Sequence, residues 1–248
     1  MNKYFFEVFE NIPRQGPGSN IITAQAYNLV KNNLPLKPDI LDIGCGKGVQ
    51  TLELARLSKG KIKAVDKHQF FLDCLKSSAE KSGLDDRILT INADMKALPF
   101  YEQSFDLIWA EGSVFVIGME EGLKNWKNYL RKGGCLALSE LVWHSDDRPQ
   151  ELTDFWKKDC IAVLTIEEVL ELAKKEGYAE IAHFAFPDEA WTEEYSNKME
   201  KVVALLKKKN RNIKAAMEVY ESLEMENYIV RKYLGYFGYE FFLWRSKN

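Results

Sequence analysis

The chain has 248 residues, of which 46% are hydrophobic and 29% are charged, and its formal net charge is −3. This is an ordinary globular composition, and the length fits one large α/β domain or one domain with a cap. The chain has no basic domain and no charged tail, which argues against duplex nucleic acid as a partner.

Several features bear on the cellular setting. No stretch approaches the ~18 consecutive apolar residues of a membrane span. Glu7 and Glu10 interrupt the apolar N-terminus, so it does not resemble a signal peptide. The cysteines form no C-x-x-C pattern and the histidines show no metal-ligand spacing. These residues are Cys45, Cys74, Cys135, Cys160, His68, His144 and His183. We therefore expect a cytoplasmic protein with reduced cysteines, no membrane segment and no bound metal.

The first 35 residues are predicted to form two helices joined by a turn. Residues 4–10 (YFFEVFE) are aromatic-rich and helical, and residues 14–19 (RQGPGS) place two glycines around a proline, which predicts a fixed turn. Ser19 is placed to N-cap a helix from Asn20 to about Asn33. The turn is interpreted either as an ordinary surface turn or as a lid over a ligand.

The most informative stretch is residues 40–48, which read ILDIGCGKG. An apolar run ends in three glycines at alternate positions, and a helical pattern starts at Val49. This order of strand, glycine turn and helix is typical of the first unit of a nucleotide-binding α/β fold. Glycine permits the unusual backbone angles of such a turn and the close approach of a ligand. The start of the helix offers free N–H groups to that ligand.

The charges around this turn narrow the type of ligand. A dinucleotide fingerprint would place its third glycine at position 49, where the chain has valine. The pattern is instead D-x-G-x-G-x-G, beginning at Asp42. A carboxylate two residues before the turn would repel a pyrophosphate, and it suits a ligand with an ammonium or sulfonium group.

The rest of the chain alternates between strand and helix patterns. Gly83 and Gly177 are placed to end helices, and Thr165 with Glu168 forms a predicted capping box. Strands are expected at 61–65, 87–91, 104–110, 134–142, 178–186 and 239–244. Helices are expected at 68–82, 122–130, 151–159, 166–175, 194–210 and 213–234, with a turn at 131–134. The last strand is too apolar for a free edge, so we expect it to lie inside the sheet.

The D-x-G-x-G-x-G pattern, together with LPF at 98–100 and FDLI at 105–108, resembles the Rossmann-like class I S-adenosylmethionine (SAM)-dependent methyltransferases. The resemblance covers about 36–142 through specific motifs and 178–246 more loosely. RQGPGS resembles a subgroup of methyltransferases that act on small molecules. The resemblance implies a seven-stranded, mostly parallel α/β sheet with helices on both faces and an antiparallel last strand. It implies one domain: N-terminal helices and lid (1–35), sheet core (36–186), helical cap insertion (187–236) and last strand (237–248).

Several residues are expected to bind SAM. Asp66 lies 22 residues after Gly44 at the end of the second strand, where an acid reaches ribose hydroxyls; a helix-capping role is the alternative. The family pattern implies that Asp94 accepts from the adenine amine and that Met95 packs on the ring; the alternative for Asp94 is a turn cap. Arg14 is a candidate for the methionine carboxylate or an anionic substrate. The full set is Arg14, Gly16, Asp42, Gly44, Cys45, Gly46, Asp66, Lys67, Ala93, Asp94, Met95 and Glu111.

The residues expected to bind the methyl acceptor carry no specific motif. Residues 111–115 follow the fourth strand at the switch point of the sheet and are expected to face the transferable methyl. They lack the N/D-P-P-Y/F motif that methyltransferases acting on nucleobases and some protein amides carry. Glu111 and His144 are the candidate catalytic acid and base, with hydrogen bonding within their loops as the alternative for each. The candidate substrate-binding residues are Phe115, Trp143, Trp191 and Tyr195, of which the last two fit a core-packing role equally well.

The sequence therefore predicts methyl transfer from SAM to a small-molecule acceptor, with S-adenosylhomocysteine as the other product. A SAM-binding protein without catalysis is the main alternative. An NAD-dependent dehydrogenase is disfavoured by Asp42 and Val49, and an aminopropyl transferase on the same fold lacks an identifiable acidic cleft. The oligomeric state is left open, with a homodimer as one option.

Overall fold

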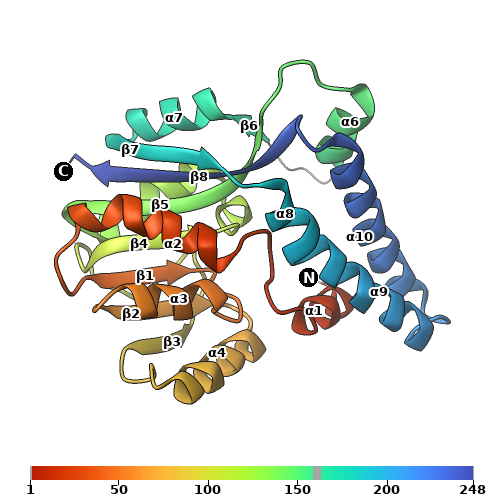
Figure 1. Ribbon diagram of the computed structural model, residues 1–248, viewed down its shortest axis with the longest axis horizontal. Helices are drawn as coiled ribbons and strands as arrows, with labels where there is room; N and C mark the ends of the chain where they lie inside the picture. Colours follow the sequence, from red (N-terminus) through yellow and green to blue (C-terminus); the bar gives the residue numbers. More distant parts are fainter. Residues whose placement is uncertain (1, 159–162, 248) are drawn as a thin grey trace.

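The computed structural model describes residues 2–158 and 163–247. Its centre is one sheet with the strand order β3-β2-β1-β4-β5-β8-β7, and the two-residue β6 pairs with β5 outside this path (Figure 1). The strands are β1 (Asp39–Ile43), β2 (Lys61–Asp66), β3 (Ile88–Asn92), β4 (Phe105–Glu111), β5 (Leu130–Trp143), β6 (Leu164–Thr165), β7 (Tyr178–Ala185) and β8 (Phe237–Ser246).

The predicted sheet topology is confirmed. β1 pairs in parallel with β2 and β4, while β8 runs antiparallel between β5 and β7. The last strand is therefore an interior strand, as its apolar sequence predicts. The short β6 was not predicted, and it adds an eighth strand to the expected seven.

The helices also follow the predicted order. Ser19 Oγ caps α2, Gly83 ends α4 in the left-handed region, and Thr165 with Glu168 forms the capping box of α7. The helices are α1 (Lys3–Glu10), α2 (Asn20–Val30), α3 (Val49–Leu57), α4 (Gln69–Ser82), α5 (Met119–Trp126), α6 (Gln150–Lys158), α7 (Ile166–Lys175), α8 (Asp188–Trp191), α9 (Asn197–Lys209) and α10 (Lys214–Tyr233).

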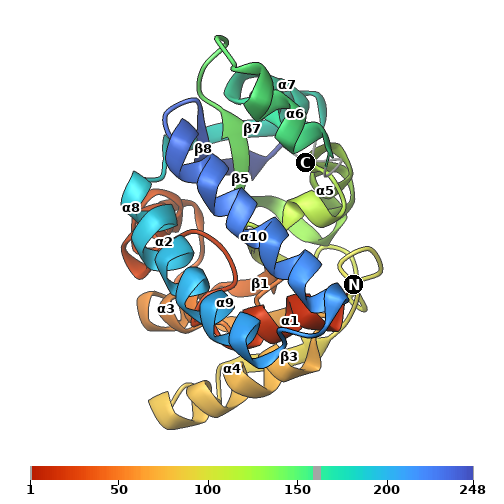
Figure 2. The same ribbon diagram turned by 90° about the vertical axis from the view of Figure 1, so that its right-hand side faces the viewer.

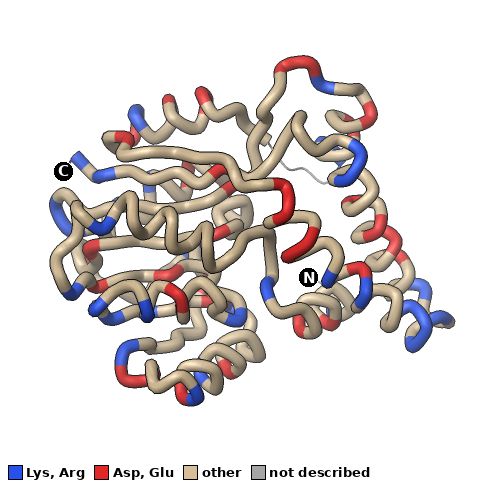
Figure 3. The backbone as a smooth tube through the Cα atoms, in the orientation of Figure 1, with Lys and Arg blue, Asp and Glu red and all other residues tan. Residues whose placement is uncertain are grey.

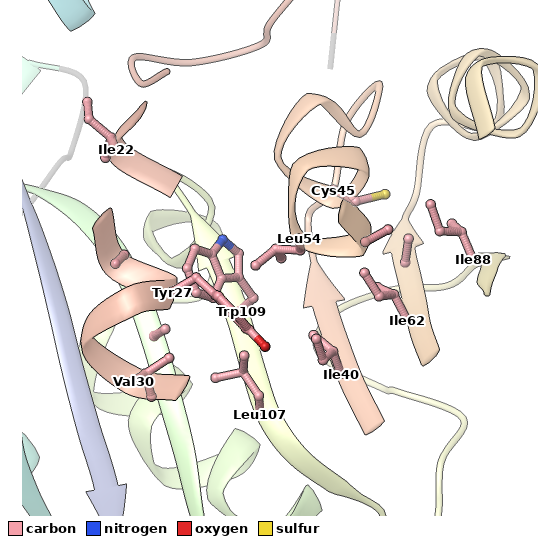
Figure 4. Close-up of a cluster of buried hydrophobic side chains, with 14 of the residues drawn as sticks. Ile22, Tyr27, Val30, Ile40, Cys45, Leu54, Ile62, Ile88, Leu107 and Trp109 are labelled. Atoms are coloured by element: carbon pink, nitrogen blue, oxygen red, sulfur yellow. The ribbon is translucent and has the colours of Figure 1, made fainter. Parts of the chain in front are cut away.

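Two apolar layers cover the two faces of the sheet. Tyr27 and Val30 of α2 and Leu54 of α3 pack against Leu107 and Trp109 of β4 (Figure 4). On the other face, α5 and α7 pack on β4, β5 and β8. Because both faces are buried, the central strands are continuously apolar, as the interior of a parallel sheet requires.

A third apolar cluster joins α1 and the helices α8–α10 to the ends of β5 and β8. These helices lie beyond the carboxyl ends of the parallel strands (Figures 1 and 2). We call α8–α10 the cap.

Residues 207–209 form a basic run in the last turn of α9, where the helix dipole favours positive charge (Figure 3). The domain boundaries drawn from the sequence stay predictions.

Besides β6, the segment at the start of β5 differs from the prediction. The expected turn at 131–134 is part of β5, which begins at Leu130 and passes a register shift opposite Phe105–Leu107. Arg131 binds Asp39 and Asp106, both at 2.8 Å, and these ion pairs hold the irregular start of the strand on its neighbours. The expected helix 151–159 is seen as α6 up to Lys158; its last residue and Cys160 lie outside the described residues.

Candidate cofactor and acceptor site

The glycine turn after β1 is closely packed on all sides. Gly44, Gly46 and Gly48 have φ of +72°, +53° and +74°. A Cβ atom on Gly44 would lie 2.5 Å from Ser113 Cβ, and one on Gly48 would lie 2.2 Å from Leu75 Cδ1. The alternate glycines are therefore required by the backbone conformation and by the neighbouring chain.

Asp42 lies beneath this turn and is fully buried. Its Oδ2 accepts hydrogen bonds from Thr51 Oγ1 at 2.5 Å and from Gln50 Nε2 at 3.4 Å, both on α3. Burial raises the pKa of Asp42 to about 7, with a further contribution from Glu111. Asp42 thus braces the start of α3 from the protein interior. Cys45, the other non-glycine position expected to bind, is also buried, and its carbonyl accepts from Gln50.

The raised pKa of Asp42 predicts a pH dependence of stability. The folded state holds a proton on this carboxyl up to about pH 7, whereas the unfolded chain loses it near pH 4. Stability from this group is therefore complete below pH 4 and is lost as the pH rises toward 7. We expect Asp42→Asn to flatten the fall in the free energy of unfolding between pH 5 and 7, measured by urea denaturation. An unchanged pH profile would contradict this assignment.

Asp66 meets the glycine turn from the end of β2. Its Oδ2 accepts from the amide of Gly46 at 2.9 Å and its Oδ1 accepts from the amide of His68 at 2.8 Å. Burial raises the pKa of this carboxyl, and these amides oppose the rise. Asp66 does not cap α4, because the N-cap residue is His68 and the bond to its amide lies just before the helix. Each oxygen of Asp66 keeps a lone pair for another donor.

The residues that follow β2 and β3 include other predicted binding residues. Lys67 Nζ pairs with Asp94 Oδ2 at 2.8 Å, and this bond lowers the pKa of Asp94. The amide of Ala93 donates to the Asp66 carbonyl at 3.2 Å. Met95 Cε lies 3.5 Å from the Cβ position of Gly44. The structure therefore brings the predicted ribose and adenine residues together along one edge of the sheet.

The RQGPGS segment is tied to the end of β4. Arg14 forms a buried ion pair with Glu111, whose Oε1 also accepts from Thr23 Oγ1 at 2.7 Å and Trp109 Nε1 at 2.9 Å. Arg14 Nη1 is buried and finds no acceptor among the described residues. Because both oxygens of Glu111 already accept hydrogen bonds, its contacts fit a positioning role better than the predicted role of a catalytic acid.

Gln15 on the lid and Lys47 in the glycine turn make contacts that no motif predicts. Gln15 Oε1 accepts from the amide of Lys47 at 2.9 Å and lies 2.6 Å from the Cβ position of Gly46. Lys47 Nζ donates to the carbonyls of Glu10 and Ile12 at 2.6 and 2.9 Å. The neighbouring Gly16, predicted to bind the cofactor, has open space at its Cβ position. The N-terminal segment therefore lies directly over the glycine turn, as a lid would.

The predicted acceptor residues do not form one group. His144 Nε2 lies 3.5 Å from Glu240 Oε2, and His183 Nδ1 lies 2.7 Å from the other oxygen of this buried carboxylate. Phe115 is 54% exposed. Trp143, Trp191 and Tyr195 are buried in the third apolar cluster, so the packing role that the sequence left open for Trp191 and Tyr195 is present. Glu240 was missed because an acid within the apolar run of β8 carries no motif.

Comparisons with known proteins agree with this geometry. Residues 40–134 match the family model described as a methyltransferase domain. A SAM-dependent methyltransferase from Geobacter sulfurreducens, solved with S-adenosyl-L-homocysteine, superimposes with a TM-score of 0.83 and 19% identity, covering 98% of both chains. The family match is thus confined to residues 40–134, whereas the structural likeness extends over nearly the whole chain. The fold of the chain is accordingly the Rossmann-like methyltransferase fold that the glycine motif predicts.

Curated methyltransferases resemble only part of the chain. The methyltransferase GfsG of Streptomyces halstedii is 32% identical over 104 residues, which cover 42% of this chain and 37% of the relative. The 27-O-demethylrifamycin SV methyltransferase of Amycolatopsis mediterranei is 30% identical over 123 residues, covering 48% of this chain and 45% of the relative. The match thus spans less than half the length of either relative.

The remaining features of the molecule do not point to another binding site. Within residues 2–158 and 163–247, no helix is long and apolar enough to cross a membrane, and no three acidic, histidine or cysteine side chains gather as metal ligands. Two surface hollows lie near Tyr178 and Gly133, around the start of β7 and the end of β8. They are remote from the glycine turn, so we assign the binding site from the strand ends instead.

Proposed function

We propose that this protein transfers a methyl group from SAM to a small-molecule acceptor. The observation that carries the proposal is the hydrogen bond from the glycine turn to Asp66, with Asp94 held by Lys67 after the neighbouring strand at the same edge of the sheet. This edge, between β1 and β4, is where open α/β sheets bind their ligands. The rifamycin relative, whose name denotes a small-molecule methyltransferase, supports the acceptor class.

The residues fit SAM in chemistry and in position. Asp66 accepts hydrogen bonds from the ribose hydroxyls, and Asp94 with Met95 receives the adenine. Arg14 has an unpartnered, buried Nη1 suited to the methionine carboxylate. When bound, SAM supplies an already activated methyl group, so the protein contributes mainly positioning and exclusion of water. The lid formed by Gln15 and α1 provides that exclusion.

The alternatives differ in the ligand or in catalysis. A dinucleotide would meet Val49 where the fingerprint requires glycine, which disfavours an NAD-dependent dehydrogenase. A non-catalytic SAM-binding protein would share every cofactor contact and differ only at the acceptor site. We also propose a cytoplasmic location, with a homodimer as one option for the oligomeric state.

Binding measurements test the cofactor directly. We expect SAM and S-adenosylhomocysteine to raise the melting temperature, with about 2.7 kcal/mol of added stability at 100 times the dissociation constant. NAD⁺ at the same concentration is expected to leave it unchanged. Stabilisation by NAD⁺ alone would refute the methyltransferase assignment.

Asp66→Ala is expected to weaken S-adenosylhomocysteine binding about tenfold or more, because a charged hydrogen-bond acceptor is lost. Isothermal titration calorimetry on the folded variant measures this change. Asp85→Ala, at an exposed position between α4 and β3, is the matched control and should bind normally. Equal affinity in both variants would remove Asp66 from the ribose role.

A further inference from the structure

The helix α1 packs on the cap through apolar side chains. Val8 and Phe9 are buried in the third apolar cluster, together with Met199 and Val203 of α9. The ring centroid of Phe9 lies 6.4 Å from that of Tyr195. Figure 2 shows α1 beside the end of α9 and the start of α10. The N-terminal helix and the cap therefore share one apolar core.

Glu7 joins α1 to the place where the two long cap helices meet, which we call the α9–α10 junction (residues 209–220). Its Oε1 accepts from Lys209 Nζ at 2.8 Å. Its Oε2 accepts from Asn210 Nδ2 at 3.1 Å and from the hydroxyl of Tyr220 at 3.4 Å. Asn210 ends α9, Tyr220 belongs to α10, and both are buried. One carboxylate of α1 thus holds both helices of the cap.

The contacts of α1 with the glycine turn and α4 are mostly polar. Lys47 Nζ donates to the carbonyls of Glu10 and Ile12 at 2.6 and 2.9 Å. Glu10 Oε1 lies 2.7 Å from His68 Nε2, and the ring of Phe6 stacks on His68 with centroids 4.2 Å apart. Water replaces hydrogen bonds that are broken, whereas a packed apolar core is costly to open. We therefore expect α1 to separate from the turn more readily than from the cap.

The segment after α1 is fixed at the base of the cap. The amide of Gly18 donates to the carbonyl of Ala190 in α8 at 3.1 Å. The Cβ position of Gly18 lies 2.9 Å from Arg14 Nε, and Arg14 is paired with Glu111 of β4. These contacts join the lid to the cap and to the sheet at one place, and the α9–α10 junction lies at the other end of the cap (Figure 1).

We propose that α1 and the cap move as one body about this fixed end, so that SAM enters and S-adenosylhomocysteine leaves only when the cap lifts with α1. Gln15 covers the glycine turn through its bond to the Lys47 amide, and its Nε2 donates to the carbonyls of Phe9 and Ile12 at 3.2 and 3.1 Å. This side chain therefore follows α1. Glu7 is the positioning residue that makes the cap follow as well. The inference rests on the proposed function, because it assigns a motion to the proposed cofactor site.

The shared motion couples the cofactor edge to the cap. A cofactor that holds α1 on the glycine turn also favours the lowered cap, and anything that holds the cap down slows cofactor release, because coupling between sites is reciprocal. The α9–α10 junction should therefore respond to a cofactor that binds at the strand ends.

The first test measures the binding rates of S-adenosylhomocysteine to Glu7→Ala by surface plasmon resonance. In this variant α1 lifts without the cap, so we expect the association and dissociation rate constants each to rise about tenfold. The dissociation constant should stay within about threefold of wild type, because the same contacts are lost with and without ligand. Loss of a direct ligand contact would instead raise the dissociation rate alone.

Glu224→Ala is the matched control for this test. Glu224 accepts from Lys207 Nζ at 2.7 Å, so the substitution breaks an ion pair between α9 and α10 but leaves the contacts of α1 in place. We expect this variant to keep the wild-type association and dissociation rates.

Hydrogen exchange with mass spectrometry tests the coupling in the wild type and does not depend on the folding of a variant. We expect S-adenosylhomocysteine to slow the exchange of amides in residues 3–15 and also in the α9–α10 junction. In Glu7→Ala the protection of residues 3–15 should remain, and that of the junction should be lost.

The outcomes separate the two proposals. A wild type that does not bind S-adenosylhomocysteine refutes the proposed function, and the coupling with it. If the wild type binds but its α9–α10 junction gains no protection, the coupling alone is refuted. Binding rates of Glu7→Ala within about twofold of wild type would likewise overturn the coupling.

Discussion

Arg14→Met is expected to lower the free energy of unfolding by about 3 kcal/mol, because it removes one partner of a buried ion pair. The side chains of Arg14 and Glu111 are only 9% and 3% exposed. Without Arg14, Glu111 keeps its hydrogen bonds from Thr23 and Trp109 but has no cation to balance its charge. Urea denaturation at pH 7 measures the loss.

A double variant controls for the change in packing. Arg14→Met with Glu111→Gln removes both charges, so we expect it to recover at least half of the lost stability. If Arg14→Met alone costs less than 1 kcal/mol, the pair does not anchor the lid.

The same ion pair shows where prediction from the sequence reached its limit. The strands and helices were predictable because each is specified locally: Ser19 and Thr165 cap helices, and Gly83 ends one. The position of the last strand was predictable because residues 239–244 are too apolar for an exposed edge. In contrast, Arg14 and Glu111 are 97 residues apart, and no local pattern specifies their contact.

The unpredicted parts of the site have a common physical origin. Gln15 meets Lys47 only because α1 folds back over the glycine turn. Glu240 sits within an apolar strand, where one acid gives no periodic signal, yet it contacts both His144 and His183. Asp42 was expected to face the ligand, yet the hydroxyl of Thr51 holds it beneath α3. Sequence motifs thus locate the edge of the sheet where the cofactor is proposed to bind. The contacts of the lid and of the acceptor site depend on tertiary packing.

Gly48→Ala is expected to be the most damaging of the glycine substitutions in the turn. Its φ of +74° costs an L-residue about 1–2 kcal/mol. The new methyl would also lie 2.2 Å from Leu75 Cδ1 and within 3 Å of two further Leu75 carbons, so α4 must shift. Overpacking of a buried contact adds about 1–3 kcal/mol. We therefore expect a total loss of about 3 kcal/mol in the free energy of unfolding, measured by urea denaturation.

Gly83→Ala separates the two costs because it repeats the backbone strain without the clash. Gly83 has a φ of +65°, and no atom lies within 4 Å of its Cβ position. We expect this variant to lose only about 1 kcal/mol. Adding Leu75→Ala to Gly48→Ala should cost less than the sum of the two single losses, because the small side chain accommodates the methyl. Equal losses for Gly48→Ala and Gly83→Ala would show that backbone conformation alone, and not the contact with α4, requires the third glycine of the turn.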